Sequence, residues 1–326
     1  MRCARHDAAR GRAGQRLSPA VLFAIATAIW GSTWLAIKFQ LGVVAPQASV
    51  AYRFALAAAI LAAWCIARGQ PMLMGGRTHA WLALQGATFF GLNYVGVYIA
   101  ERYVASGLVA VIFSTIVFMT PIGTRVAFGT PIPGRLAVGG ALGVAGVALL
   151  FVPELRAAGE GGDAALGVSL ALGSTVVAAV GNLVSMRLQR DRVPLFPGTA
   201  WGMGYGALSA AIVATLAGVD WTFDTRMPYV LSLVYLAILG SIVAFGAYFM
   251  LLQKVGAGPA SFVGVSTPVL AMVLSTLFEN YRWTAVAVAG VVLAAAGNVI
   301  ALRRVRARRG DPGAGQARPG DGAGGS

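Results

Sequence analysis

Ten long apolar stretches follow one another along this chain of 326 residues, with only short polar segments between them. Each stretch holds about 20 residues, which at a rise of 1.5 Å per residue matches the ~30 Å hydrocarbon layer of a membrane. Because the stretches are continuously apolar instead of alternating, they predict helices and not the strands of a barrel. The expected spans are 19–40, 48–67, 79–100, 104–126, 135–152, 166–187, 196–218, 228–251, 257–279 and 283–302.

Composition points to the same class of protein. Apolar residues make up 58% of the chain and charged residues only 11%, whereas a soluble protein carries about a quarter. We therefore expect an all-α integral membrane protein without room for a folded soluble domain. The two cysteines, Cys3 and Cys65, imply no disulfide framework. The basic segment 1–18 is expected to stay attached as a cytoplasmic N-terminus, and 303–326 to form a basic, disordered cytoplasmic tail.

The net charge of +14 is distributed unevenly between the two predicted sides of the membrane. With the N-terminus inside, 19 of the 25 basic residues fall in cytoplasmic segments, including those of both chain ends. This is the positive-inside bias, and it places both termini in the cytoplasm. Anionic lipid of the bilayer, and not nucleic acid, is the partner that this charge predicts.

A weak internal repeat divides the chain into two five-helix units, 19–152 and 166–302. A shift of 151 residues places Gly107 on Gly258 and Gly139 on Gly290, and a shift of 150 places Gly31 on Gly181. A unit with an odd number of spans must enter the membrane from the opposite side in its second copy. The repeats are therefore predicted to be inverted, an arrangement that supports alternating access in many carriers.

Several spans carry polar or aromatic side chains at depths where lipid-facing residues are expected. Trp30 lies 11 residues after Pro19, roughly 17 Å into the first span, well away from the interfacial aromatic belt. Such side chains either line a shared polar cavity or bond to neighbouring helices, and the sequence leaves both roles open. The residues that we expect to line a cavity and bind a solute are Trp30, Trp34, Asn93, Tyr94, Tyr98, Asn182, Tyr248 and Ser266.

Charged residues and prolines within or near the spans suggest further roles. Arg53 either snorkels outward, pairs with an acid such as Glu101, or attracts an anionic group, so Arg53 and Glu101 are candidates for gating or charge recognition. Lys38 is expected to snorkel to the outer surface. Pro121 and Pro268 are expected to kink their helices and free the carbonyls of Val117 and Gly264, respectively.

Groups that would support catalysis are missing from the predicted spans. The two histidines, His6 and His79, lie outside or at the edge of the spans, and no metal-ligand cluster, phosphate-binding loop or Ser/His/Asp set is visible. We therefore expect no enzyme activity, no cofactor and no metal site.

Four segments taken together resemble a known family. They are "AIWGSTWLAIK", "AYRFALAA", "ASGLVAVIFSTIVFMTP" and "GPASFVGVSTPVLAMVLSTLFE", and the last ends in an acidic residue at Glu279. In order and spacing they are similar to the EamA type of the drug/metabolite transporter superfamily. The chain departs from that pattern at Val117, where the family often has proline, and at Phe128 and Gly129, where an acidic residue is usual.

The resemblance implies carriage, often export, of amino acids or related small metabolites across a bacterial inner membrane. Together with the repeat, it favours a secondary carrier that works by alternating access. A channel and a non-transporting scaffold or sensor are the alternatives. The expected partners are a small-molecule solute and the bilayer. The sequence leaves open whether the protein forms a homodimer.

Overall fold

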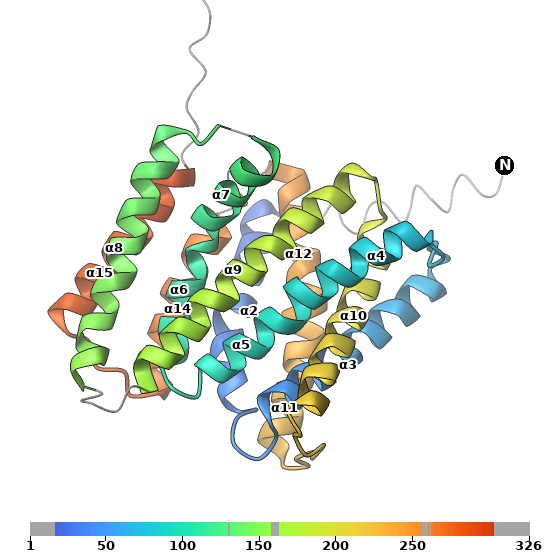
Figure 1. Cartoon of the computed structure of the whole chain (residues 1–326), viewed down its shortest axis with the longest axis horizontal. Coiled ribbons are helices and arrows are strands. Elements are labelled where there is room, and N and C mark those ends of the chain that lie inside the picture. The colour runs from blue at the N-terminus through green and yellow to red at the C-terminus, as the bar shows by residue number, and fades with distance from the viewer. Residues whose placement is uncertain (1–16, 130, 158–162, 256–259, 261, 303–326) are drawn as a thin grey trace, which may run out of the picture.

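The computed structural model describes residues 17–129, 131–157, 163–255, 260 and 262–302. The two chain ends that we expect to be cytoplasmic therefore lie almost entirely outside the described residues. Every element in the described part of the chain is helical (Figure 1). The elements are α2 (Pro19–Lys38), α3 (Pro46–Ala67), α4 (Gly76–Gln85), η1 (Gly86–Leu92), α5 (Asn93–Ala100), α6 (Ser106–Ser114), α7 (Ile116–Phe128), α8 (Gly134–Ala157), α9 (Asp163–Arg190), α10 (Leu195–Leu216), α11 (Met227–Tyr235), η3 (Leu236–Val243), α12 (Ala244–Val255), α14 (Phe262–Phe278) and α15 (Ala285–Leu302).

Membrane-spanning length is reached by seven of the described helical segments. Continuous segments such as Gly76–Ala100 and Met227–Val255 are long and apolar enough to cross a bilayer. Three shorter apolar helices accompany them, at Gly134–Leu150, Phe262–Phe278 and Ala285–Ala301. The prediction of an all-helical protein with many membrane-spanning segments is confirmed.

Local sequence explains where several helices begin and end. The Ser18 hydroxyl accepts a hydrogen bond from the Val21 N–H at 3.3 Å, and Pro19 occupies the first turn of α2. Pro46 starts α3 in the same way. Helix α7 ends at Gly129, whose φ of 68° lies in the left-handed region that glycine adopts without a steric penalty.

Two long segments contain a π-helical stretch at matching positions. The stretch η1 begins at Gly86 and η3 begins at Leu236, which is 150 residues later and agrees with the shift of the sequence repeat. A π-helical turn holds one residue more than an α-helical turn, so it changes the direction in which all later side chains point. Such stretches are frequent at functional sites.

Glycines allow several helix pairs to approach closely. Helices α8 and α15 lie side by side at one edge of the bundle (Figure 1), where a Cβ on Gly146 would lie 2.6 Å from the Gly290 carbonyl oxygen. Helix α10 likewise packs against η1, and a Cβ on Gly206 would lie 3.0 Å from the Gly86 carbonyl oxygen. The glycine spacing in these helices is therefore used for packing.

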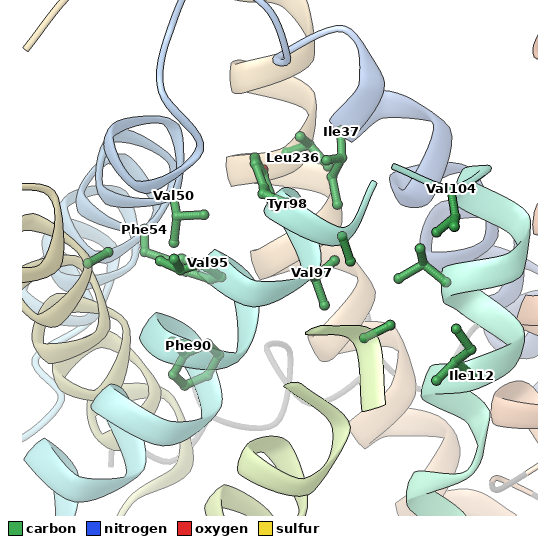
Figure 2. Close-up of a cluster of buried hydrophobic side chains, with 14 of the residues drawn as sticks. Ile37, Val50, Phe54, Phe90, Val95, Val97, Tyr98, Val104, Ile112 and Leu236 are labelled. Carbon is green, nitrogen blue, oxygen red and sulfur yellow. The ribbon is translucent and has the colours of Figure 1, made fainter. Parts of the chain in front are cut away.

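The main hydrophobic core joins helices from both halves of the chain. Phe54 of α3, Phe90 of η1 and Tyr98 of α5 belong to one buried cluster with Ile112 of α6 and Leu236 of η3 (Figure 2). The Phe54 ring lies 5.4 Å from that of Phe90. This core leaves a hollow on one side, where the candidate functional site lies.

Candidate functional site

A cavity of about 500 Å³ lies between helices of both halves of the chain. Its wall is formed by residues of α2, of the α4–η1–α5 segment, of α6 and α7, of α9 and the start of α10, of α12 and of α14. None of the described residues that line it is Asp, Glu, Lys, Arg or His. Nine aromatic rings line it: Trp30, Trp34, Phe89, Phe90, Tyr94, Phe113, Phe245, Tyr248 and Phe249.

Trp30 is fixed in the cavity wall by contacts with the second half of the chain. Its indole N–H donates a hydrogen bond to the Gly240 carbonyl at 3.2 Å, within the π-helical stretch η3. Its ring lies 5.1 Å from Phe245 and 5.4 Å from Tyr248 of α12. The tryptophan in the middle of the first span therefore has both a polar partner and an aromatic surrounding, which lipid would not supply.

Six of the eight expected lining residues face this cavity: Trp30, Trp34, Asn93, Tyr94, Asn182 and Tyr248. Tyr98 and Ser266 are not among the residues that line it. Tyr98 lies one turn beyond Tyr94, is fully buried, and donates a hydrogen bond to Gln40 Oε1 at 2.8 Å. In α14 the neighbours of Ser266, Thr267 and Pro268, line the cavity instead.

The sequence analysis missed several lining residues on the α4–η1–α5 segment. Gln85 and Phe89 line the cavity together with Asn93, and the three are four residues apart. Their spacing of four residues was a usable signal that the sequence analysis did not use. The π-helical turn of η1 changes the facing side, so an α-helical stripe drawn across it does not stay on one surface.

The two span prolines lie inside helices that border the cavity. Pro121 lies in α7 and Pro268 in α14. Because proline has no N–H, the carbonyls of Val117 and Gly264 lack their usual helical donor, and both residues line the cavity. In the fourth span, α6 and α7 meet at Thr115, which is upstream of Pro121.

The cavity opens at one end of the bundle. Its lining continues to the connection between α9 and α10, where it includes Gln189, Val193 and Pro194. Gln189 and Pro194 are exposed. Arg190 ends α9 and Arg192 lies in the connection, so the mouth is at an arginine-rich end of the molecule.

The opposite end is closed by a buried polar cluster around Arg53, which is 1% exposed. The guanidinium donates to Ser241 Oγ at 3.3 Å and to the Tyr98 hydroxyl at 3.4 Å. It also lies over the rings of Phe54 and Tyr94, 5.0 and 4.7 Å from their centroids. Arg53 therefore does not snorkel outward, and its charge is held among neutral and aromatic groups.

Glu101 lies near this cluster without an ion pair to Arg53 among the described contacts. Its side chain is fully buried, and neither carboxylate oxygen has a hydrogen-bond partner. The Glu101 main-chain carbonyl accepts a hydrogen bond from Lys38. An unpartnered carboxyl group at 0% exposure is costly for folding, and no hydrogen bond in the described part of the chain offsets that cost.

Lys38 and Glu279 form the ion pair of the closed end. The Lys38 ammonium lies 3.4 Å from Glu279 Oε1 and donates to the Val104 carbonyl at 3.0 Å. Glu279 also accepts from the Ser106 N–H at 3.2 Å and from the hydroxyl of Ser275. The expectation that Lys38 snorkels is wrong, because its side chain is bound between α2, the start of α6 and the end of α14.

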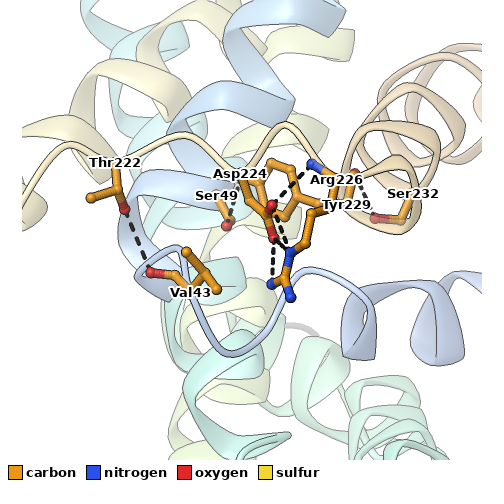
Figure 3. A network of polar contacts seen from close by, with 7 residues as sticks. All are labelled: Val43, Ser49, Thr222, Asp224, Arg226, Tyr229 and Ser232. Atoms are coloured by element: carbon orange, nitrogen blue, oxygen red, sulfur yellow. Dashed lines mark hydrogen bonds and ion pairs between the residues drawn. The ribbon is translucent and has the colours of Figure 1, made fainter.

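Connecting segments cover the same end of the bundle (Figure 3). Thr222 Oγ1 donates to the Val43 carbonyl at 3.5 Å, and the hydroxyls of Ser49 and Tyr229 lie 3.0 Å apart. Asp224 pairs with Arg226 at 2.7 Å. The hydrogen bonds from Arg226 lower the pKa of the Asp224 carboxyl below its usual value. These contacts tie the α10–α11 connection to the α2–α3 connection.

Such a helical bundle around a cavity that opens at one end is the architecture of a membrane transporter. The model of the EamA-like transporter family matches twice, over residues 17–152 and 165–303, which together make up most of the chain. The chain therefore belongs to the EamA-like transporter family, and the resemblance of its motifs is confirmed.

Individual relatives agree with that assignment. A WAT1-related protein of Arabidopsis thaliana, described as chloroplastic, is 25% identical over 81% of this chain, which spans only 64% of that protein. The uncharacterized inner membrane transporter YedA of Escherichia coli K12 is 29% identical over 76% of this chain and 78% of its own length. A probable amino-acid metabolite efflux pump of the same strain is 24% identical over 87% of this chain and 95% of its own length.

A solved crystal structure shares the fold. It covers 87% of this chain and 96% of its own, with a TM-score of 0.61 and 20% sequence identity. At that identity the likeness concerns the fold alone.

Proposed function

We propose that this protein is a secondary carrier that exports a small metabolite, an amino acid or a related compound, across the inner membrane by alternating access. The observation that carries the proposal is one cavity of about 500 Å³ that is open at one end and closed by buried polar groups at the other. Its volume lies within the range of about 300–1,000 Å³ that small-molecule sites occupy. The names of the Escherichia coli relatives, an inner membrane transporter and a metabolite efflux pump, support an inner-membrane location and transport out of the cell.

The proposed architecture is ten membrane spans in two inverted five-helix repeats, about 19–152 and 166–302. Helix contacts support it, because they occur in corresponding pairs. Helix α2 packs against α12 and α14, and its counterpart α9 packs against α5 and α7. Helix α3 packs against η3, and α10 packs against η1. Helices of both halves therefore pack against each other around the cavity in corresponding pairs.

The open end is proposed to face the cytoplasm, with both chain ends on that side. Arg187, Arg190 and Arg192 are at or near the mouth, as the positive-inside rule requires of a cytoplasmic surface. The cluster of Arg53, Lys38 and Glu279 is then at the outer side. In this assignment the structure is the inward-open conformation, which is the one that an exporter needs to load its solute.

Alternating access requires the closed end to separate and the open end to close. Opening outward must break the ion pair between Lys38 and Glu279 and move Ser241 or Tyr98 away from Arg53. The repeat relation supplies a second packing in which the two halves exchange roles. Arg53 and Glu101 are thus proposed to act in gating at the outer end.

A channel is the main alternative, and it would need a continuous polar path or a selectivity filter. The described wall is largely aromatic, and one end is blocked by groups that are 0–1% exposed. A scaffold without transport would not need an open cavity in its interior. Neither alternative accounts for the cavity as well as a carrier does.

Comparative metabolomics tests the carrier proposal. Cells that overproduce the protein are expected to lose one or a few metabolites to the medium relative to cells that overproduce Trp30→Ala at equal membrane abundance. The same compounds should enter inside-out vesicles only when the wild-type protein is present. Equal metabolite profiles in all strains, or ionic currents across a planar bilayer, would contradict the proposal.

A further inference from the structure

Most side-chain donors of the cavity wall already donate hydrogen bonds within the protein. The Gln85 amide donates to Ser185 Oγ at 2.8 Å, the Asn93 amide to the Phe89 carbonyl at 3.1 Å, and the Asn182 amide to a threonine hydroxyl at 3.3 Å. The serine and threonine hydroxyls of the wall donate to backbone carbonyls three or four residues earlier in their own helices. Each of the three amides keeps a second N–H, so the donors left to a solute are uncharged ones.

Acceptors, in contrast, remain free on the same wall. The side-chain carbonyl oxygen of Asn93 is buried and has no hydrogen-bond partner. That of Gln85 also has none, but it lies against α10, 2.7 Å from the position of a Cβ on Gly202. Asn93 is 1% exposed, so bulk water does not satisfy its oxygen. Val117 and Gly264 add backbone carbonyls that lack a helical donor because of the prolines four residues later. A buried acceptor without a donor is unfavourable until a donor arrives.

The donors that remain on this wall are all uncharged. They are the second N–H of the Gln85, Asn93 and Asn182 amides, the Trp34 N–H, the hydroxyls of Tyr94 and Tyr248, and the Gln189 amide at the mouth. Each tyrosine hydroxyl accepts as readily as it donates. The wall therefore offers an anion only uncharged donors.

The charge around the cavity points the same way. No ionised side chain is found among the described lining residues, so a carboxylate would meet no cation. The Arg53 guanidinium is 1% exposed and lies behind the Tyr94 ring at 4.7 Å. Aromatic faces are electronegative and attract cations, and nine rings line this space.

From these observations we infer that the solute is a protonated organic amine with an apolar body, at least one N–H donor and no carboxylate. The ammonium binds among the aromatic faces and donates to the free oxygen of Asn93. The inference rests on the proposed carrier function and narrows its solute from amino acids and related compounds to their amine members.

A matched set of phenyl compounds tests the inference in solution. We would titrate the purified full-length protein in detergent with phenethylamine, phenylalanine, 3-phenylpropionate and trimethyl(phenethyl)ammonium, and follow the intrinsic tryptophan fluorescence, to which Trp30 and Trp34 in the cavity wall contribute. Phenethylamine should bind roughly tenfold or more tightly than phenylalanine and 3-phenylpropionate. The trimethylated compound should bind a few-fold more weakly than phenethylamine because it has no N–H. Equal or tighter binding of 3-phenylpropionate or phenylalanine would overturn the inference.

Two substitutions of Asn93 are expected to change the affinity for phenethylamine in opposite directions. Asn93→Leu should weaken phenethylamine binding about tenfold, and Asn93→Asp should strengthen it, because the first removes the acceptor and the second adds a negative charge. Asn298→Leu is the matched control: this amide is equally buried and also has a free oxygen, but it lines a separate small pocket. A change of the same sign in both Asn93 variants, with native thermal unfolding, would indicate a purely structural role and reject the assignment.

Transport separates a failure of this inference from a failure of the proposed function. Binding of phenethylamine without its movement into inside-out vesicles would contradict the carrier and leave the amine site standing. Movement of 3-phenylpropionate together with its binding would contradict the amine site and leave the carrier standing.

Discussion

Removing the charge of Glu279 should shift the protein toward an outward-open conformation. Its carboxylate lies 3.4 Å from the Lys38 ammonium, which at an effective dielectric constant of about 20 corresponds to an attraction of about 5 kcal/mol. The two side chains are 28% and 13% exposed, so screening and side-chain ordering reduce the net value. We expect about 1.4 kcal/mol, which is a tenfold change in the conformational equilibrium. Glu279→Gln isolates the charge because glutamine can still accept from the Ser106 N–H.

A cysteine in the cavity reports this equilibrium. Gly264 lines the cavity, and a Cβ added there meets no atom within 4 Å, so Gly264→Cys adds a reporter without a clash. In a background without Cys3 and Cys65, a membrane-impermeant maleimide reaches the reporter from outside only in the outward-open state. If that state is a minor one, its labelling in right-side-out vesicles should rise about tenfold with Glu279→Gln. Labelling in inside-out vesicles should fall only slightly.

The matched control is the exposed pair between Arg187 and Asp191, whose atoms lie 3.1 Å apart at the open end. Both side chains are 42% exposed, so Asp191→Asn should leave labelling from either side unchanged. Glu279→Asp should lie closer to wild type than Glu279→Gln because it keeps the charge. Unchanged outside labelling in Glu279→Gln, at normal protein abundance, would refute the role of the ion pair in closing this end.

Three further changes test other parts of the structure. Trp30→Ala should reduce transport about tenfold or more at unchanged membrane abundance, as measured by vesicle uptake and immunoblotting, whereas equal loss of protein and transport would indicate packing. Gly146→Leu should lower the free energy of unfolding by roughly 1–3 kcal/mol, because a Cβ there lies 2.6 Å from a carbonyl oxygen of α15. Gly173→Ala is the control and should leave thermal unfolding unchanged, because a Cβ at Gly173 has no neighbouring atom within 4 Å. The lowered pKa of Asp224 stabilises the fold above the ordinary pKa of Asp and this contribution is lost as the pH falls through the lowered value. Asp224→Asn should therefore lower the melting temperature slightly at neutral pH and leave it unchanged in acid. This pH-dependent effect should disappear when Arg226, which donates the hydrogen bonds, is also replaced.

Hydrophobic length was enough to predict an all-helical protein with many membrane spans, because that signal depends only on about 20 consecutive apolar residues. Mid-span position was enough to select Trp30, Trp34, Asn93 and Asn182 for a cavity wall. The reason is that a polar or indole group at this depth needs a partner other than lipid. Whether that partner is a solute remains a prediction, but the four side chains do face one cavity.

Side-chain direction beyond η1 was not accessible from the sequence. Tyr94 and Tyr98 share a stripe of an ideal α-helix, yet Tyr94 lines the cavity and Tyr98 is buried in the Arg53 cluster. Both follow the π-helical turn of η1, which therefore moves them together. Tyr98 differs because it lies one turn closer to the closed end, where its hydroxyl bonds with Arg53 and Gln40. These partners come from α3 and the α2–α3 connection, and a reading of one span does not contain them.

Partners of charged residues were equally hidden. Lys38 and Glu279 are 241 residues apart, and nothing local indicates that they meet. Snorkelling was expected for Lys38 and was one of three roles left open for Arg53, because each was considered as part of one helix facing lipid. In the folded chain another helix faces each of them and supplies oxygen atoms or aromatic rings at lower cost than reaching the interface.

The π-helical stretch η3 connects the cavity to its closed end. In the second half, η3 carries the Gly240 carbonyl that binds Trp30 in the cavity wall and, at the next residue, the Ser241 hydroxyl that accepts from Arg53 in the closed end. The Ser241 hydroxyl in turn donates to the Leu236 carbonyl at 2.9 Å, five residues earlier, across the wide turn. A solute that displaces Trp30 therefore acts on the same turn of backbone that holds Arg53. This shared turn provides a short physical route by which loading of the cavity could loosen the opposite end, which a carrier requires and a passive channel does not.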